Sequence, residues 1–331
     1  MKSIGIITSG GDAPGMNAVL WAAVKAARFR NMKVYGVANG YQGLIDNDII
    51  ELNDRDIEGI IDRGGTRLGT ARCAAMFTKE GQETAVQNMY AHGIEGLLVA
   101  GGDGSYRGAR DLTALGVPIV GVPATIDNDL GYTDNCIGFD TACNTAVDCI
   151  GKIRDTMMSH SRVAVIEVMG RHCGDIALTV GMVGGADYIL VPEVEYDKPF
   201  DIDNVVERLS QNRQFGNKSG MVVMAEGVMY EHKNRAELLG QMIVERMPQL
   251  DLKVNVLGHV QRGGTPSARD RRYALQMTER AVQLLHHGDT GRVVGIKDSA
   301  VMDMPLEDAL SVKKVLNESL LRLAHALGQA I

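Results

Sequence analysis

The 331-residue chain contains few cysteine and aromatic residues. Its five cysteines, at positions 73, 136, 143, 149 and 173, are odd in number and form no CxxC pair. The sequence therefore indicates neither a disulfide framework nor a zinc site, and a reducing cytoplasm is the simplest location. Aromatic residues make up only 5% of the chain whereas glycines number 39, a balance that favours an α/β enzyme with many tight turns.

Long apolar segments and basic runs are also missing. The N-terminal residues lack the apolar stretch of a signal peptide, and the uncharged run 113–126 carries two prolines and is shorter than the roughly 20 residues that a membrane helix needs. We therefore expect a soluble protein. The net charge of −7, without a basic run, argues against a nucleic-acid partner. Any anionic ligand must then be held by local arginines.

Short apolar runs that end in glycine or an acid recur along the chain, each followed by a helical pattern. This alternation predicts crossover units and largely parallel, buried sheets. The length suggests two α/β domains, each doubly wound, with a boundary at the start of a helix expected over residues 140–158. The expected strands are residues 4–8, 34–37, 96–100, 119–122, 163–168, 188–191, 221–225, 254–257 and 293–296.

Three segments predict phosphoryl transfer: residues 8–17 (TSGGDAPGMN), 99–105 (VAGGDGS) and 123–129 (PATIDND). Glycines at strand ends let the backbone approach phosphate oxygens, and adjacent carboxylates suit a divalent cation or the removal of a proton. Asp127 and Asp129 point the same way if their backbone is extended. Each segment also has an ordinary explanation, because glycine-rich turns are common and an Asp-Asn-Asp run can cap a helix.

Four arginines are candidates for holding an anion, and three of them stand beside turns of small residues. A guanidinium grips phosphate oxygens at two points, although a solvated surface arginine is the default interpretation for any one of them. His259 could donate to a substrate or be a satisfied buried histidine. The arginines are Arg72, Arg162, Arg171 and Arg262.

Together these segments resemble the bacterial ATP-dependent 6-phosphofructokinases, from Lys2 to about Gly295. The motifs GGDAPGMNA, GGDGS, TIDND, MGRHCGD and LGHVQRGG occur here in one order. The resemblance implies a phosphofructokinase-like fold and the Mg-ATP-dependent phosphorylation of fructose 6-phosphate at its 1-hydroxyl. It also implies an ATP-binding domain of residues 1–138 plus about 266–310, and a fructose-6-phosphate-binding domain of residues 139–265 plus about 311–331.

The resemblance assigns roles residue by residue. Asp127 matches the general base, with Thr125, Arg72 and Arg171 beside the transferring phosphoryl group. Asp103 and Asp129 match residues that organise magnesium. Other residues matching those that bind ATP are Gly11, Tyr41, Cys73, Gly102, Gly104 and Ser105. Those matching residues that bind the sugar phosphate, besides Thr125, Asp127 and Arg171, are Arg162, Met169, Gly170, Glu226, Lys253, His259 and Arg262.

Arg162 and Lys253 correspond to groups that come from a neighbouring subunit, so the resemblance implies a homotetramer. Lys253 replaces the usual arginine, which predicts a weaker grip on the sugar phosphate. Ala124 replaces a glycine common in ATP users. The pyrophosphate-dependent relatives have an acid at Gly104 and a lysine at Ala124, so room for the ATP α-phosphate is preserved.

The family's effector pocket is basic, but this chain has Trp21 and Asp54 where arginine is usual. We therefore expect a weak or absent response to phosphoenolpyruvate and ADP. The other residues that match this pocket are Lys25, Arg154, Asp187 and Arg213.

Alternatives to the main interpretation are a pyrophosphate-dependent enzyme, another kinase with a GGDG loop, and a non-catalytic subunit that senses sugar phosphates.

Overall fold

The computed structural model describes residues 1–193, 201–329 and 331, and the chain divides into two compact units. Unit 1 comprises Met1–Thr141 and Arg262–Lys314, and unit 2 comprises Ala142–Gln261 and Val315–Ile331. Unit 1 ends its first segment at residue 141, where 138 was expected, and its second segment spans residues 262–314, where about 266–310 was expected. None of the helices in the described part of the chain combines the length and hydropathy that a bilayer crossing requires.

Unit 1 is built on a seven-stranded sheet with the order β11-β10-β5-β4-β1-β2-β3. The five central strands are parallel, and β3 and β11 pair antiparallel at the two edges. Strand β1 is buried throughout, as is β4. The strands are β1 Ser3–Thr8, β2 Lys33–Val37, β3 Ile49–Leu52, β4 Gly96–Gly101, β5 Ile119–Pro123, β10 Arg292–Lys297 and β11 Ala300–Pro305.

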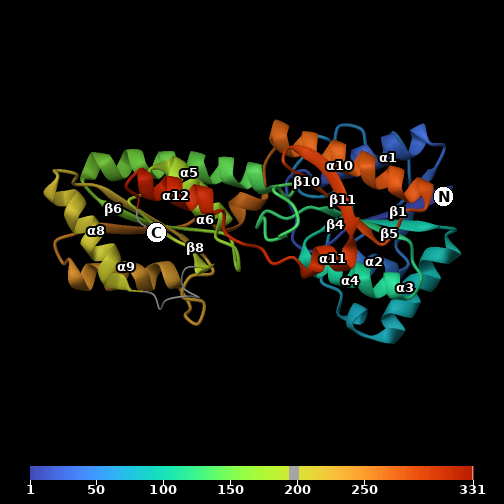
Figure 1. The fold of residues 1–331 in the computed structure, drawn as a ribbon, viewed down its shortest axis with the longest axis horizontal. Coiled ribbons are helices and arrows are strands. Elements are labelled where there is room, and N and C mark those ends of the chain that lie inside the picture. The colour runs from blue at the N-terminus through green and yellow to red at the C-terminus, as the bar shows by residue number, and fades with distance from the viewer. Residues whose placement is uncertain (194–200, 330) are drawn as a thin grey trace. The chain divides into compact units, whose positions relative to one another are not determined.

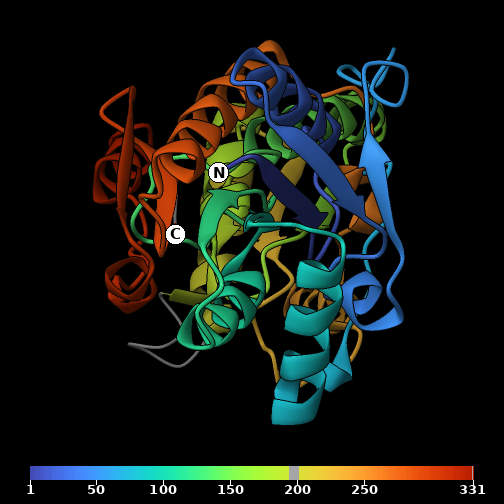
Figure 2. The same ribbon diagram turned by 90° about the vertical axis from the view of Figure 1, so that its right-hand side faces the viewer.

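Helices cover both faces of this sheet (Figures 1 and 2). Helices α1 and α10 pack together on one face, and α3, α4 and α11 lie on the other. The last turn of α10 gives way to Gly288, whose φ of 85° suits a residue without a Cβ. The helices are α1 Met16–Phe29, α2 Tyr41–Asp46, the 3-10 turn Ala74–Phe77, α3 Lys79–Ala91, α4 Asp103–Ala114, α10 Ala268–His287 and α11 Leu306–Ser311.

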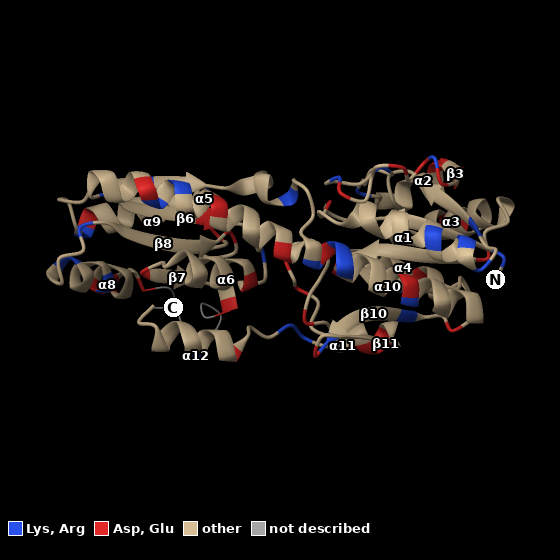
Figure 3. Ribbon diagram, turned by 90° about the horizontal axis from the view of Figure 1, so that it is seen from above, with Lys and Arg blue, Asp and Glu red and all other residues tan. Residues whose placement is uncertain are grey.

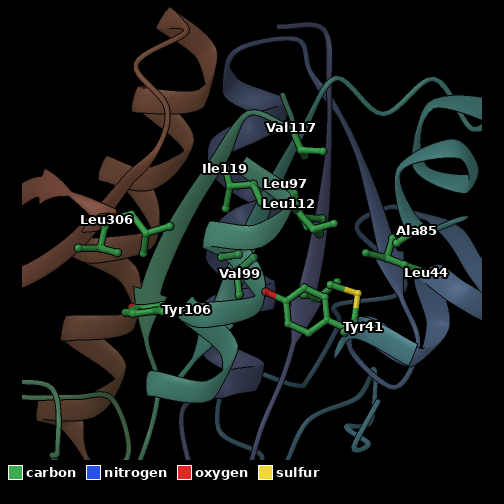
Figure 4. Close-up of a cluster of buried hydrophobic side chains, with 14 of the residues drawn as sticks. Tyr41, Leu44, Ala85, Leu97, Val99, Tyr106, Leu112, Val117, Ile119 and Leu306 are labelled. Atoms are coloured by element: carbon green, nitrogen blue, oxygen red, sulfur yellow. The ribbon is translucent and has the colours of Figure 1, made fainter. Parts of the chain in front are cut away.

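One hydrophobic cluster of unit 1 lies between the sheet and α4 (Figure 4). Apolar side chains of β4, β5 and α4 meet there, including Leu97, Val99 and Leu112. Two buried tyrosines share a hydrogen bond, because the hydroxyls of Tyr106 and Tyr132 lie 3.0 Å apart. This packing fixes the ends of β4 and β5, where two of the predicted loops begin.

Unit 2 has a four-stranded parallel sheet with the order β7-β8-β6-β9. In Figure 1, α5 and α6 lie above its strands and α8 and α9 below them. Helix α5 begins in unit 1 and continues into unit 2. The elements are α5 Phe139–His160, β6 Val163–Val168, α6 Asp175–Gly184, β7 Tyr188–Leu190, α8 Ile202–Gln214, β8 Gly220–Ala225, α9 Arg235–Arg246, β9 Leu252–Val256, the 3-10 turn Gly258–Arg262 and α12 Glu318–Ala326.

The predicted fold class is confirmed, and all nine expected strands and the helix at 140–158 are present. The described residues hold two further strands, β3 and β11, which the sequence analysis missed. Both are antiparallel edge strands with partly exposed residues, so they lack the continuous apolar run by which the other strands were recognised. In Figure 3 acidic and basic residues are interspersed along both units, in keeping with the absence of a basic run.

Candidate active site

Three loops meet at the carboxyl ends of the central strands of the unit 1 sheet. Strands β5, β4 and β1 are adjacent and parallel, so their carboxyl ends bring the predicted segments together. The backbone links them directly: the N–H of Ser9 donates to the carbonyl of Ala100 over 2.9 Å, and that of Ala124 to Gly101 over 3.0 Å. Ligands of open parallel sheets bind at this edge.

The first loop is held by residues far away in the sequence. The Thr70 hydroxyl donates to the Gly10 carbonyl over 2.6 Å, which ties the segment carrying exposed Arg72 to this loop. Arg262 donates to the Asp12 carbonyl over 3.1 Å, and its guanidinium lies so close to Gly11 that a Cβ there would be 2.4 Å away. The expected boundary placed Arg262 in the sugar-phosphate domain. In the structure Arg262 belongs to unit 1.

The second loop opens α4 and leaves a polar cradle. Gly102 precedes the helix and Asp103 begins it, with the Asp103 carboxylate 2.7 Å from Arg107. The Ser105 hydroxyl is buried and finds no hydrogen-bond partner among the described residues. A Cβ placed on Gly104 would meet no atom within 4 Å, so space is open beside the loop. An anion at the helix N-terminus could accept hydrogen bonds from the Ser105 hydroxyl and the first backbone N–H groups of α4.

Tyr41 supports the second loop from within the core (Figure 4). The side chain is buried, and its hydroxyl donates to the carbonyl of Ser105 over 2.6 Å. Burial raises the pKa of Tyr41, so the phenol stays protonated as the donor. Cys73 has a free thiol, is half-buried and packs against the same cluster. Contacts of Tyr41 and Cys73 with a nucleotide stay a prediction.

The third loop is a turn, whereas a common direction of Asp127 and Asp129 would require extended backbone. Asn128 has a φ of 53°, in the left-handed region, and its side chain accepts from the N–H of Cys136 over 2.8 Å. The Thr125 hydroxyl accepts from the N–H of Asp127 over 3.3 Å. The condition of extended backbone is therefore not met, since these local bonds favour a turn at an asparagine.

The three aspartates nonetheless influence one another. Burial, followed by the charge of Asp127 and more weakly that of Asp103, raises the pKa of Asp129 to about 6, while Lys314 acts in the opposite direction. One Asp129 carboxyl oxygen is buried and lacks a hydrogen-bond partner in the described residues. Mutual repulsion of clustered carboxylates is relieved by a cation, and Mg²⁺ prefers oxygen ligands. Asp103 and Asp129 therefore fit a magnesium ion.

The acid cluster does not make a complete metal cage. In residues 1–193, 201–329 and 331, no three His, Cys, Asp or Glu side chains are grouped so that they could hold a metal ion. Mg²⁺ commonly binds through one or two carboxylates and completes its shell with waters and substrate phosphates. The arrangement thus suits a cation that arrives with a nucleotide.

In unit 2 a second group of predicted residues surrounds the end of β6. Met169 follows this strand and is buried, and Gly170 has a φ of 118°, which only glycine adopts readily. Arg171 comes next and is exposed. The N–H of Glu226 donates to the carbonyl of Val168 over 2.8 Å, which brings Glu226 to the same strand end.

Two predicted cations of unit 2 share a carboxylate that the sequence analysis missed. Asp251 accepts from the Nε of Arg162 over 2.5 Å and pairs with the Nζ of Lys253 over 2.7 Å. Hydrogen bonds from Lys253 and then Arg162 hold the pKa of Asp251 below its ordinary value. Asp251 therefore holds the two cations side by side and offsets one of their two positive charges. His259 is exposed on the adjacent 3-10 turn.

Comparison with known proteins agrees with this geometry. A family model described as phosphofructokinase matches residues 3–285. The chain belongs to the phosphofructokinase family. A relative from Clostridioides difficile (strain 630), named ATP-dependent 6-phosphofructokinase, is 48% identical over 328 residues, which cover 99% of this chain and all of the relative. A relative of the same name from Bacillus pumilus (strain SAFR-032) is also 48% identical over 328 residues.

Solved phosphofructokinases share the fold. The T-state structure from Pichia pastoris has a TM-score of 0.88 at 34% identity, covering 98% of this chain and 36% of that longer chain. The pyrophosphate-dependent phosphofructokinase from Marinobacter aquaeolei has a TM-score of 0.85 at 26% identity, covering all of this chain and 88% of the other. Since the second enzyme is named for a different donor, the fold alone does not select between donors.

The residues predicted for the family's effector pocket already have partners within their own units. In unit 1, Asp54 pairs with Lys25 over 2.6 Å and also with Arg28, and Lys25 lies 5.7 Å from the Trp21 ring centroid. In unit 2, Arg154 donates to Gly184, Arg213 to Lys218, and Asp187 accepts from Met221 and Asn212.

Proposed function

We propose that this member of the phosphofructokinase family transfers the γ-phosphoryl group of ATP to the 1-hydroxyl of fructose 6-phosphate. The main support is that three glycine-containing loops lie at the carboxyl ends of adjacent parallel strands. Three aspartates of these loops interact electrostatically. Nucleotide phosphates suit the cradle of Gly11, Gly102, Gly104 and Ser105, while the aspartates suit a metal ion and proton removal.

Asp127 is the proposed general base. The 1-hydroxyl oxygen attacks the γ-phosphorus, its proton passes to the Asp127 carboxylate, and the bond from phosphorus to the β,γ-bridging oxygen breaks to release ADP. Thr125, Arg72 and Arg171 donate hydrogen bonds to the migrating group, whose negative charge spreads over its oxygens. The Thr125 hydroxyl already bonds the Asp127 backbone, which supports a fixed relation between the two.

Asp103 and Asp129 are the proposed magnesium residues. A magnesium ion held by these residues together with ATP would neutralise phosphate charge and would help to orient the triphosphate for in-line transfer. The unpartnered, buried oxygen of Asp129 supports this assignment. A bound cation would relieve the repulsion among the aspartates.

The choice of ATP over pyrophosphate rests on two small residues. Gly104 and Ala124 are smaller than the acid and the lysine that the pyrophosphate-dependent relatives carry there, and a side chain on Gly104 would meet no atom within 4 Å. The ATP α-phosphate therefore has room. The names of the 48%-identical relatives support the same donor.

Binding of the sugar phosphate is proposed for Met169, Gly170, Glu226, His259 and Arg262, together with two cations supplied by a neighbouring subunit. Asp251 holds those cations, Arg162 and Lys253, side by side. A homotetramer with shared active sites is part of this proposal. A cytoplasmic location is part of it too, because ATP and sugar phosphates are metabolites of that compartment.

Replacing the base tests the chemistry. Asp127→Ser should lower kcat by roughly two to four orders of magnitude with little change in fructose 6-phosphate binding, the usual range for a positioned base. A coupled assay with ATP and, separately, pyrophosphate measures kcat and KM. Asp308→Ser, at an exposed acid of α11, is the matched control and should keep wild-type turnover. Undiminished turnover of the Asp127 variant would remove this residue from the mechanism.

Metal titration tests the acid pair separately. Chelation by EDTA should abolish turnover, and Asp129→Asn should raise the magnesium concentration needed for half-maximal activity by roughly tenfold or more, because one ligand charge is lost. Activity measured over a range of MgCl₂ concentrations at saturating ATP, for the wild type and for Asp129→Asn, gives the change in the half-maximal magnesium concentration. If the variant and the wild type gave superimposable magnesium curves, Asp129 would not be a metal residue.

A further inference from the structure

Tyr230 lies between two arginines of unit 2. The guanidinium carbon of Arg171 is 5.4 Å from the centroid of the Tyr230 ring, and that of Arg235 is 5.0 Å from it. Arg171 also donates a hydrogen bond to the Tyr230 hydroxyl. The ring of His172 is a further neighbour at 5.7 Å between centroids. Tyr230 therefore meets Arg171 through both its face and its hydroxyl.

Arg235 fixes the loop that carries Tyr230. Its side chain donates to three carbonyls of that loop: Tyr230 over 3.1 Å, His232 over 3.0 Å, and Glu226. Three bonds from one rigid, planar group hold the loop in one shape. The backbone bond from Glu226 to Val168 anchors its other end to the carboxyl end of β6.

The two loops are in direct contact. A Cβ added to Gly227 would lie 2.1 Å from the carbonyl oxygen of Arg171 and 3.1 Å from that of Gly170. Only a glycine permits this approach. The backbone of Arg171 and the backbone leading to Tyr230 therefore pack without an intervening side chain, and any shift of one loop is transmitted to the other.

We propose that Tyr230 is a positioning residue that holds the Arg171 guanidinium ready for the migrating phosphoryl group. An arginine has five N–H donors, so one directed at the Tyr230 hydroxyl leaves four for phosphoryl oxygens. Contact with the Tyr230 ring restricts the Arg171 side chain before substrate binds. The conformational entropy of Arg171 is then already lost and does not add to the activation free energy. This inference rests on the role proposed above for Arg171.

Two substitutions of Tyr230 separate the ring from the hydroxyl. Tyr230→Leu removes both contacts and should lower kcat about fivefold, and Tyr230→Phe, which keeps the ring, should lower it about twofold. The KM values for both substrates should change little, because the stabilisation acts on the transition state. Tyr90→Leu on α3 is the matched control, since Tyr90 is 48% exposed and Tyr230 44%. Urea unfolding confirms that each variant is folded.

A double-substitution cycle shows whether Tyr230 acts through Arg171. In an Arg171→Met background, Tyr230→Leu should change the residual kcat by less than about 1.5-fold, because the group it positions is gone. An equal loss in both backgrounds, or a full-activity Tyr230→Leu enzyme, would overturn the positioning role alone. If Arg171→Met itself kept wild-type turnover, the proposed role of Arg171 would fail and this inference with it.

Discussion

Asp129 stands out at the scale of single residues because its environment disfavours its charge. Burial and the neighbouring Asp127 raise its pKa to about 6 from an ordinary value of 3.8. A carboxyl group with a raised pKa in the folded state contributes stability that is fully present below about pH 4. That contribution is lost as the pH rises through about 6. Without a cation, the folded protein therefore tolerates an unfavourable charge at neutral pH.

Asp129→Asn should relieve this cost. In metal-free buffer at pH 7.5 the variant's free energy of unfolding should exceed that of the wild type by about 1–3 kcal/mol, and the difference should vanish below about pH 4. Urea unfolding across pH 4 to 8 measures it. A variant less stable than the wild type at pH 7.5 would contradict the electrostatic account.

Asp251 supplies a control of opposite sign. Its pKa is lowered by Lys253 and Arg162, so its contribution is present at neutral pH and is lost as the pH falls through the lowered pKa. Asp251→Asn should therefore destabilise the protein at pH 7.5, and added salt should shrink the effect because the site is exposed. Finding the same sign for both substitutions would show that the pH dependence arises elsewhere.

At the scale of elements, two buried threonines associated with α10 should respond oppositely to loss of their hydroxyls. Thr141, near the start of α5, donates to Asp270 over 2.5 Å and accepts from the N–H of Ser267 over 2.9 Å. The Thr278 hydroxyl is fully buried in α10 and has no partner in the part of the chain that the structure describes.

Thr141→Val should lower the free energy of unfolding by about 1–3 kcal/mol. It removes one hydrogen bond to the buried Asp270 carboxylate, which keeps the bond from the Thr141 N–H, and it leaves the Ser267 N–H without its Thr141 partner. Thr278→Val has the same shape change but removes an unpaired polar atom, so it should be neutral or stabilising by up to about 1 kcal/mol. Urea unfolding of both variants under one set of conditions makes the comparison. Equal destabilisation would mean that the hydroxyl contacts do not determine the outcome.

The same scale shows what the sequence could predict. Parallel strands such as β4 and β5 are buried on both faces, so their uninterrupted apolar runs were recognised. The edge strand β3 has two exposed residues among four and gave no such signal. Side-chain partners distant in sequence were equally hidden. Neither Tyr230 beside Arg171 nor Lys314 near Asp129 leaves a local pattern, because their contacts form only through the tertiary fold.

For the whole molecule, the open question is control by effectors. We propose that this enzyme responds weakly to phosphoenolpyruvate and ADP. In unit 1 the Asp54 carboxylate forms ion pairs with both Lys25 and Arg28, and the Lys25 ammonium also lies over the Trp21 ring. An anionic effector would have to displace Asp54 and would also meet its repulsion. Allosteric coupling requires a ligand to bind one state better than another, and this arrangement removes much of the attraction that would supply the difference.

The half-saturating fructose 6-phosphate concentration should therefore shift by less than about twofold with saturating phosphoenolpyruvate, against the 5- to 150-fold typical of allosteric coupling. Asp54→Asn frees both cations without changing the shape of the side chain and should strengthen phosphoenolpyruvate binding, measured by calorimetry as well as kinetics. Asp308→Asn changes the net charge equally at a remote exposed site and should leave effector binding unchanged. A strongly right-shifted, sigmoidal saturation curve in the wild type would contradict this account, because it would require an effector to compete successfully with a carboxylate already in place.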